Sequence, residues 1–112
     1  MASTPEGAVK RAVKEVLKEM GIWYYMPVQN GMGVVGIHDF MCCASGRFLT
    51  IETKAPLAPG SRKEPADLMP PNQRRVAKEV REHGGVSLVI ATTDKQVIRS
   101  MLRMSLGAAI AL

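Results

Sequence analysis

The sequence predicts one α/β domain over residues 1–112, with a mixed central sheet flanked by helices and elements in the order helix, three strands, helix, strand and helix. Apolar residues recur at helical spacing in residues 3–20, which indicates an opening helix. Three runs of β-forming residues follow, separated by glycine-containing turns. A strand, a helix and a strand come next, and this order favours a right-handed crossover between parallel strands. A chain of 112 residues is the size of one domain.

The first helix is expected over residues 3–20. Ser3 and Glu6 have the spacing of a capping box, and Gly21 is a natural stop signal. The apolar stripe of this helix consists of Val9, Val13, Val16, Leu17 and Met20. Glu6 lies about 40° from the centre of that stripe, so it is an acid on the core-facing side of the helix.

Three β-rich runs are expected to be strands, at residues 22–28, 37–44 and 47–54. A glycine-rich loop joins the first two, and Ser45-Gly46 makes a tight turn between the last two. The three strands therefore form an antiparallel meander. Trp23, Tyr24 and Tyr25 of the first strand are expected in the core.

The second half begins with a long proline-rich loop over residues 55–71, which we expect to be either functional or disordered. A second helix is expected over residues 72–83, stopped by two glycines. The apolar run 86–91 reads as a buried strand parallel to the third. A third helix should follow over residues 93–104, with Thr93 as its N-cap.

Charge and cysteine content limit the classes of function. The net charge of +5 favours a polyanionic partner, such as nucleic acid or an acidic membrane surface, although many small domains are basic only for solubility. Cys42 and Cys43 are neighbours on a strand and point to opposite faces, so they read as buried thiols of a protein in the reducing cytosol. No signal peptide or membrane-spanning run is apparent. The apolar tail 105–112 is expected to pack on the domain or on a second subunit.

Asp39, Glu52 and Lys54 form the chemically distinctive group. Glu52 and Lys54 are two residues apart and share a strand face, and the turn between the two strands brings Asp39 towards them, unless the register slips by one residue. Adjacent carboxylates remain ionised when a cation lies between them, and Mg²⁺ or Mn²⁺ suits such oxygens. An ammonium beside the ion stabilises charge on a phosphate. The set suits phosphodiester hydrolysis, and the alternative of a solvated ion pair beside a turn residue stays open at this point.

Two helical positions bear on that choice. Glu6 is either only a capping residue or also part of the site. Gln73 precedes the inward-facing Val76 and Ala77 by one helical turn, so it faces inward or is an exposed first-turn residue. If both helices pack on the sheet, Glu6 and Gln73 converge on the carboxylate pair.

With these residues in place, the chain resembles the VRR-NUC branch of the PD-(D/E)xK nuclease superfamily, in its compact stand-alone form from phage-like genomes. The similar segments are TPEGAVKRAVKEVLKEMG, GIHDF, GRFLTIETKAP, PPNQRRVAKEVREHGG and SLVI. The resemblance implies a restriction-endonuclease-like fold with an αβββαβ core.

The resemblance also implies roles for single residues. Asp39 corresponds to the metal-binding aspartate, and Glu52 and Lys54 correspond to the (D/E)-x-K pair. The backbone carbonyl of Thr53 would be a further metal ligand. His38 stands where the superfamily usually has proline, and it either reaches the phosphate or metal or is a histidine satisfied by its surroundings.

Two helical residues complete this correspondence. Gln73 matches the glutamine that opens the second helix, and Glu6 matches a first-helix acid that holds the metal directly or through water. The full set implied as catalytic is Asp39, Glu52, Lys54, Gln73 and Glu6, with Asp39, Glu52, Thr53 and Glu6 around the metal.

The expected function is a Mg²⁺- or Mn²⁺-dependent DNA endonuclease, selective for four-way junctions or other branched DNA, acting as a homodimer in a bacterial or phage-infected cytoplasm. Basic side chains for phosphate contacts are Lys10, Arg11, Lys14, Lys18, Arg47, Arg62, Lys63, Arg74, Arg75 and Lys78. The long loop 55–69 would then close over DNA. Two alternatives remain open: a non-catalytic DNA-binding module with the same fold, and a regulatory or assembly protein that uses its apolar tail.

Overall fold

The structure is a computed structural model that describes residues 4–107. Its elements are α1 (Pro5–Glu19), β1 (Trp23–Tyr25), β2 (Phe40–Ala44), β3 (Arg47–Thr53), the 3-10 helix η1 (Pro65–Leu68), α2 (Pro71–Glu82), β4 (Val86–Ile90) and α3 (Lys95–Leu106). The sheet has the order β1-β2-β3-β4, in which β4 is parallel to β3 and the other neighbours are antiparallel. The predicted mixed sheet with flanking helices is confirmed.

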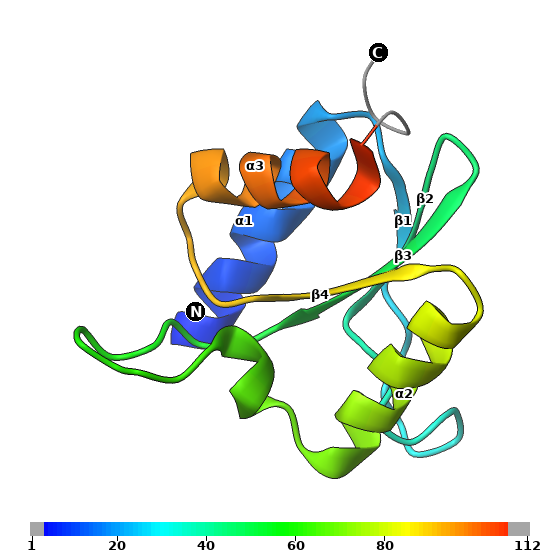
Figure 1. Cartoon of the computed structure of the whole chain (residues 1–112), viewed down its shortest axis with the longest axis horizontal. Helices are drawn as coiled ribbons and strands as arrows, with labels where there is room; N and C mark the ends of the chain where they lie inside the picture. The colour runs from blue at the N-terminus through cyan, green and yellow to red at the C-terminus, as the bar shows by residue number, and fades with distance from the viewer. Residues whose placement is uncertain (1–3, 108–112) are drawn as a thin grey trace.

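The sheet has helices on both faces, with α1 and α3 on one side and α2 on the other (Figure 1). The larger core lies under α1 and α3, and its fully buried side chains include Val9, Val13, Leu17, Phe40, Leu49, Ile51, Ile98 and Leu102. The smaller cluster under α2 consists of Met69, Ala77 and Val89, and Val76 of α2 is also buried. The α2 side therefore has little apolar filling, and buried polar side chains take its place.

The helix starts differ from the sequence-based expectation. Thr4 caps α1, because its Oγ1 accepts a hydrogen bond from the Gly7 amide at 2.9 Å. Ser3, the expected cap, lies outside the described residues. Asp94, and not Thr93, caps α3 by accepting from two first-turn amides. Aspartate is the stronger capping residue of that pair, since its carboxylate also complements the helix dipole.

The β-hairpin of β2 and β3 fixes the register on which the site depends. Ser45 and Gly46 have φ values of 49° and 86°, as the two central residues of a tight hairpin turn require. Phe40 pairs with Ile51 and both are buried in the core under α1 and α3. The next residue pair, Asp39 and Glu52, therefore points to the α2 side of the sheet.

The first strand is shorter and less buried than expected. β1 contains three residues, and Trp23 and Tyr25 expose 64% and 52% of their surface. Only Tyr24 faces inward, where its ring meets Phe40 edge to face at 5.8 Å between centroids. The prediction that all three aromatic residues lie in the core is wrong, because alternation places two of them on the open face of an edge strand. For the same reason Cys42 is buried and Cys43 is exposed, so the expectation that both thiols are buried is wrong for Cys43.

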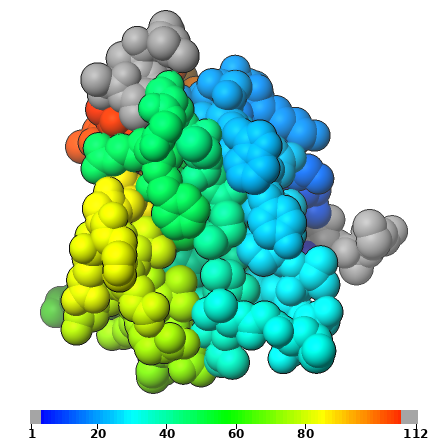
Figure 2. All heavy atoms as spheres, turned by 90° about the vertical axis from the view of Figure 1, so that its right-hand side faces the viewer, coloured from blue at the N-terminus to red at the C-terminus, as the bar shows by residue number. Residues whose placement is uncertain are grey.

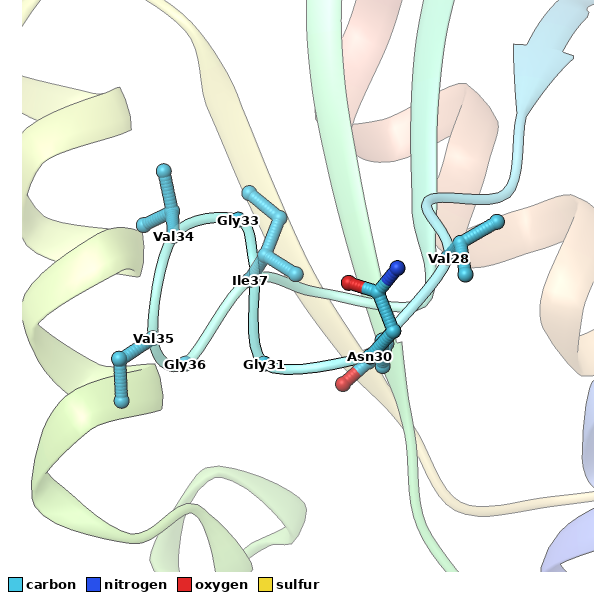
Figure 3. Close-up of a pocket in the computed structure, with 9 residues that line it drawn as sticks. Val28, Asn30, Gly31, Gly33, Val34, Val35, Gly36 and Ile37 are labelled. Carbon is cyan, nitrogen blue, oxygen red and sulfur yellow. The ribbon is translucent and has the colours of Figure 1, made fainter.

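Residues 26–39 form a long loop in place of the expected strand ends. The loop folds back on itself beside α2 and encloses a cavity of 220 Å³, with Val34 and Val35 nearest the helix (Figure 3). Gly36 has φ +83°, and a Cβ there would stand 2.4 Å from the Asn72 backbone. Arg75 also donates to the Val35 carbonyl at 3.0 Å. The loop is thus docked on the first turns of α2.

The proline-rich segment 55–70 is partly ordered by η1 and by α2. Arg74 donates from Nε to the Met69 carbonyl at 2.8 Å and from Nη2 to the Asp67 carbonyl at 3.2 Å. The Glu64 amide donates to the Asp67 carboxylate at 2.9 Å. Of the apolar tail, Leu106 is buried in the core, and residues 108–112 lie outside the described part. Within residues 4–107, no helix has the length and apolar character needed to cross a membrane.

Candidate active site

Asp39 and Glu52 lie side by side at the end of the β2–β3 ladder. Asp39 comes directly before β2, and Glu52 is the penultimate residue of β3. Both are almost completely buried, with 8% and 3% of their surface exposed. The expectation that the two carboxylates share one face of the sheet is confirmed, and the alternative of a solvated pair is wrong.

Four donors surround the Asp39 carboxylate. The backbone amide and the hydroxyl of Thr53 donate to Oδ2 at 3.0 and 2.5 Å. Lys10 Nζ is 3.6 Å from Oδ1, and Gln29 Nε2 donates to the same oxygen at 3.4 Å. Thr53 thus orients Asp39 through its amide and hydroxyl, a role that the sequence did not indicate. Charge-assisted hydrogen bonds of this kind hold a carboxylate in one orientation.

Glu52 has one paired oxygen and one unpaired oxygen. Its Oε2 lies 3.3 Å from Lys54 Nζ, whereas its buried Oε1 has no hydrogen-bond partner among the described residues. Burial and the neighbouring Asp39 charge raise the pKa of Glu52 to about 7, although Lys54 acts in the opposite direction. A buried, unpaired carboxylate oxygen is costly, so a cation at this point would relieve a real energetic penalty.

One cleft of 350 Å³ collects the predicted side chains from four parts of the chain. Glu6 comes from α1, Asp39 and Glu52 from the sheet, Lys54 from the end of β3 and Gln73 from the first turn of α2. The rest of its lining is Lys10, Met26, Pro27 and Gln29. The expected convergence of both helices on the carboxylate pair is therefore confirmed in the geometry.

Gln73 reaches the cleft from the start of α2. Its side-chain Oε1 is buried, and it meets no donor within residues 4–107. The alternative of an exposed first-turn residue is wrong. An unsatisfied amide oxygen aimed into a polar cleft is suited to bind a water molecule or a ligand group.

His38 lies behind the cleft and connects three elements. It is fully buried, its Nε2 donates to the Gln73 carbonyl at 2.9 Å, and its Nδ1 is 2.9 Å from Thr50 Oγ1. Thr50 Oγ1 is in turn 3.0 Å from Ser87 Oγ on β4. Burial lowers the pKa of His38, so the ring is neutral near pH 7. His38 is thus a satisfied histidine that ties the first turn of α2 to β3 and β4.

The donor set fits a hard divalent cation held by two carboxylates. Within residues 4–107, no three His, Cys, Asp or Glu side chains are close enough together to form a metal cluster. Glu6 lines the cleft but does not complete such a cluster with Asp39 and Glu52 within these residues. Mg²⁺ is commonly held by one or two carboxylates and completes its shell with waters and substrate phosphate oxygens. The unpaired Glu52 Oε1 is an oxygen that such a cation could bind.

Besides the contacts from Thr53, sequence reasoning missed two further contacts to Asp39. Lys10 was placed only among the basic residues of the first helix, yet its ammonium approaches the carboxylate from one helical turn beyond Glu6. Gln29 lies in a loop without periodicity, so no pattern indicated its position. Both depend on how α1 and the β1–β2 loop pack against the sheet end.

The fold can now be compared with known proteins. A solved structure described as "VRR_NUC domain" matches with a TM-score of 0.65 and 19% sequence identity, over 90% of this chain and 97% of that chain. The chain has the fold of a VRR_NUC domain. Neither a protein-family model nor a curated protein sequence matches it. The fold that the resemblance implied is confirmed, and the roles of individual residues in this VRR_NUC fold rest on the geometry of the cleft.

Proposed function

We propose that the protein is a Mg²⁺- or Mn²⁺-dependent DNA endonuclease that hydrolyses phosphodiester bonds. The observation that carries the proposal is the pair of carboxylates Asp39 and Glu52, which are buried side by side. One Glu52 oxygen, Oε1, is unpaired, and the Lys54 ammonium lies 3.3 Å from the second oxygen, Oε2. Two acids and an ammonium in one open polar cleft suit a doubly charged ion and a phosphate.

Each side chain has a defined part in this proposal. Asp39 and Glu52 would hold the ion, which supplies Lewis-acid polarisation of phosphate and a more acidic bound water. Lys54 stabilises the negative charge that develops on the phosphate and orients the attacking water. Gln73 offers its free amide oxygen to that water. We propose that the backbone carbonyl of Thr53 is a further ligand of the ion and that Glu6 acts on the ion through water.

DNA as the substrate is supported by the charge and by the position of basic residues. The chain has a net charge of +5, and Lys10 lies in the cleft itself. Arg74 and Arg75 are on the first turns of α2, next to Gln73. Such groups position phosphates without reading base sequence. We extend the proposal to a homodimer that cuts branched DNA in a bacterial or phage-infected cytoplasm, since two sites related by a twofold axis match the symmetry of a four-way junction.

The test is cleavage of duplex, flap and four-way junction DNA in Mg²⁺, in Mn²⁺ and in chelator. We expect metal-dependent cleavage of branched DNA that falls at least a hundredfold in Lys54→Ala, the loss seen when one charge-stabilising donor is removed. Arg103→Ala is the matched control, because Arg103 is an exposed cation of α3 that lines no part of the cleft and is not among the predicted phosphate-contacting residues. Cleavage that persists in chelator, or equal activity of the two variants, would refute the proposal.

A non-catalytic DNA-binding module is the second candidate, and the ion pairs favour it. Lys10 and Lys54 already place an ammonium beside each carboxylate without any metal. Calorimetric titration with Mn²⁺ separates the candidates. A nuclease should bind the ion in the wild type and lose the binding in Asp39→Asn, whereas a binding module should give no such heat in either protein.

A further inference from the structure

A second cleft adjoins the candidate active site on the other side of Lys54. It has a volume of 510 Å³, and it shares Glu6 and Lys54 with the first cleft. Its size lies within the roughly 300–1,000 Å³ that small-molecule sites occupy. Because two side chains line both clefts, the clefts are neighbours, and a ligand that extends past Glu6 and Lys54 would occupy both.

The lining of this second cleft combines aliphatic walls with cationic edges. Pro56, Leu57 and Leu68 contribute apolar surface, and the two leucines are half-buried. Lys54 and Lys63 lie at its edges. A nucleotide has the matching chemistry, because its base is flat and apolar on both faces and its phosphates are anionic.

The walls of the second cleft are held by the fold. Leu68 belongs to η1, whose end is fixed by the hydrogen bonds from Arg74 to the Asp67 and Met69 carbonyls. The Lys63 amide donates to Ser61 Oγ at 3.2 Å, which shapes the segment that contains the second lysine. The fold therefore holds the Leu68 side of the cleft, and a side that is already ordered loses less free energy on binding.

We propose that the second cleft binds one unpaired nucleotide of the DNA strand whose adjoining phosphodiester lies in the first cleft. This inference rests on the proposed function and narrows its substrate class. A base inside a continuous duplex is stacked and cannot enter, and extruding it costs free energy, least where the base is already unpaired. The enzyme would therefore prefer DNA whose strand leaves the helix beside the cut, such as a flap or a branch point.

A fluorescent base tests the proposal directly. The probe is flap DNA with 2-aminopurine as the first unpaired nucleotide, bound without cleavage to Glu52→Gln in chelator. We expect the fluorescence to rise on binding, because aliphatic walls separate the base from its neighbours. The same base placed within the duplex arm should stay quenched.

Two matched pairs of substitutions locate the effect. Ala58 lines the second cleft, whereas Ala66 is an exposed alanine of η1 outside it. Ala58→Phe should abolish the rise and weaken flap binding roughly tenfold, the size expected for one bound base, and Ala66→Phe should do neither. Lys63→Ala should weaken flap binding more than Arg62→Ala, since only Lys63 lines the cleft.

The outcomes separate the second cleft from the proposed function. Cleavage that depends on Lys54, together with an unchanged signal in Ala58→Phe, would overturn the nucleotide site and leave the nuclease standing. A fluorescence increase that Ala58→Phe abolishes and Ala66→Phe retains supports the nucleotide site, even if no cleavage is found. Equal rises from the flap and duplex probes, or no DNA binding at all, would overturn the inference.

Discussion

Glu52 is the residue at which folding and function oppose each other. Its pKa is raised from 4.5 to about 7 by burial and by Asp39. Because the folded-state pKa lies above the unfolded one, the stabilising contribution of Glu52 is fully present below about pH 4.5 and is lost as the pH rises through 7. A site optimised for stability would have no such carboxyl, which is consistent with a site that is completed by a cation.

Glu52→Gln should therefore stabilise the metal-free protein at high pH. The amide is neutral at every pH, so the free energy of unfolding of the variant relative to wild type should rise by about 2 kcal/mol between pH 5 and pH 8. Urea unfolding in chelator at both pH values measures the change. The titration of His38 affects the stability of both proteins, so the difference between them removes its contribution. Glu82→Gln, at an exposed position, is the control. A difference in unfolding free energy between Glu52→Gln and wild type that is the same at both pH values would contradict the raised pKa of Glu52.

His38 contacts the candidate site residue Gln73 through the backbone carbonyl of that residue. In His38→Ala, the Gln73 carbonyl and the Thr50 hydroxyl lose a buried partner, so the free energy of unfolding should fall by about 2 kcal/mol. Activity per folded molecule should also fall, by roughly tenfold or more in kcat with little change in KM, because Gln73 is no longer held in place. His38→Gln, which can still donate to the carbonyl, should recover part of the kcat. A loss confined to stability would show that His38 has no positioning role.

At the scale of elements, the contact of the β1–β2 loop with α2 requires a glycine. Gly36 has a positive φ and lies against the Asn72 backbone, one residue before Gln73. Gly36→Ala should cost about 2 kcal/mol or more in unfolding free energy, since it combines a disfavoured φ with a clash. Gly33→Ala is the matched control, because the added Cβ meets nothing within 4 Å. Thermal unfolding of both variants compares them, and similar melting temperatures would show that the loop moves freely.

The sequence predicts elements well where local signals determine them. The tight turn at Ser45-Gly46 and the parallel crossover to β4 follow from short motifs, and the turn brings Asp39 and Glu52 onto one face. β1 and β2 are shorter than the sequence predicts, because no local sequence signal shows that residues 26–39 pack on α2. The link from His38 to Ser87 joins residues far apart in sequence, and only tertiary packing creates it.

At the scale of the whole molecule, one face of the sheet is only partly covered. α2 packs mainly on β3 and β4, so β1 and β2 remain open beside it (Figure 2). Trp23, Cys43 and Phe48 are register partners across three strands, and all three are exposed. An apolar row of this kind on a monomer surface commonly marks a site of protein association.

The proposed homodimer should therefore depend on this row. Sedimentation velocity of the wild type should show a dimer, and Trp23→Ser combined with Phe48→Ser should shift it to monomer because the apolar contact is lost. Met104→Ser, at an exposed methionine of α3 outside the row, should leave the dimer intact. A wild type that sediments as a monomer at every concentration would refute the dimer, and equal dissociation in all variants would place it elsewhere.

Metal binding should be linked to the stability of the entire domain. An ion that binds only the folded protein stabilises it by about 2.7 kcal/mol when its concentration is a hundred times its dissociation constant. Mn²⁺ should therefore raise the melting temperature of the wild type, and chelator should reverse the increase. The effect should be greater at pH 8 than at pH 6, because Glu52 has to lose a proton to become a ligand and its pKa is about 7. Asp39→Asn should abolish the increase, and Glu82→Gln should retain it. An increase that survives in Asp39→Asn would show that the ion binds outside the cleft.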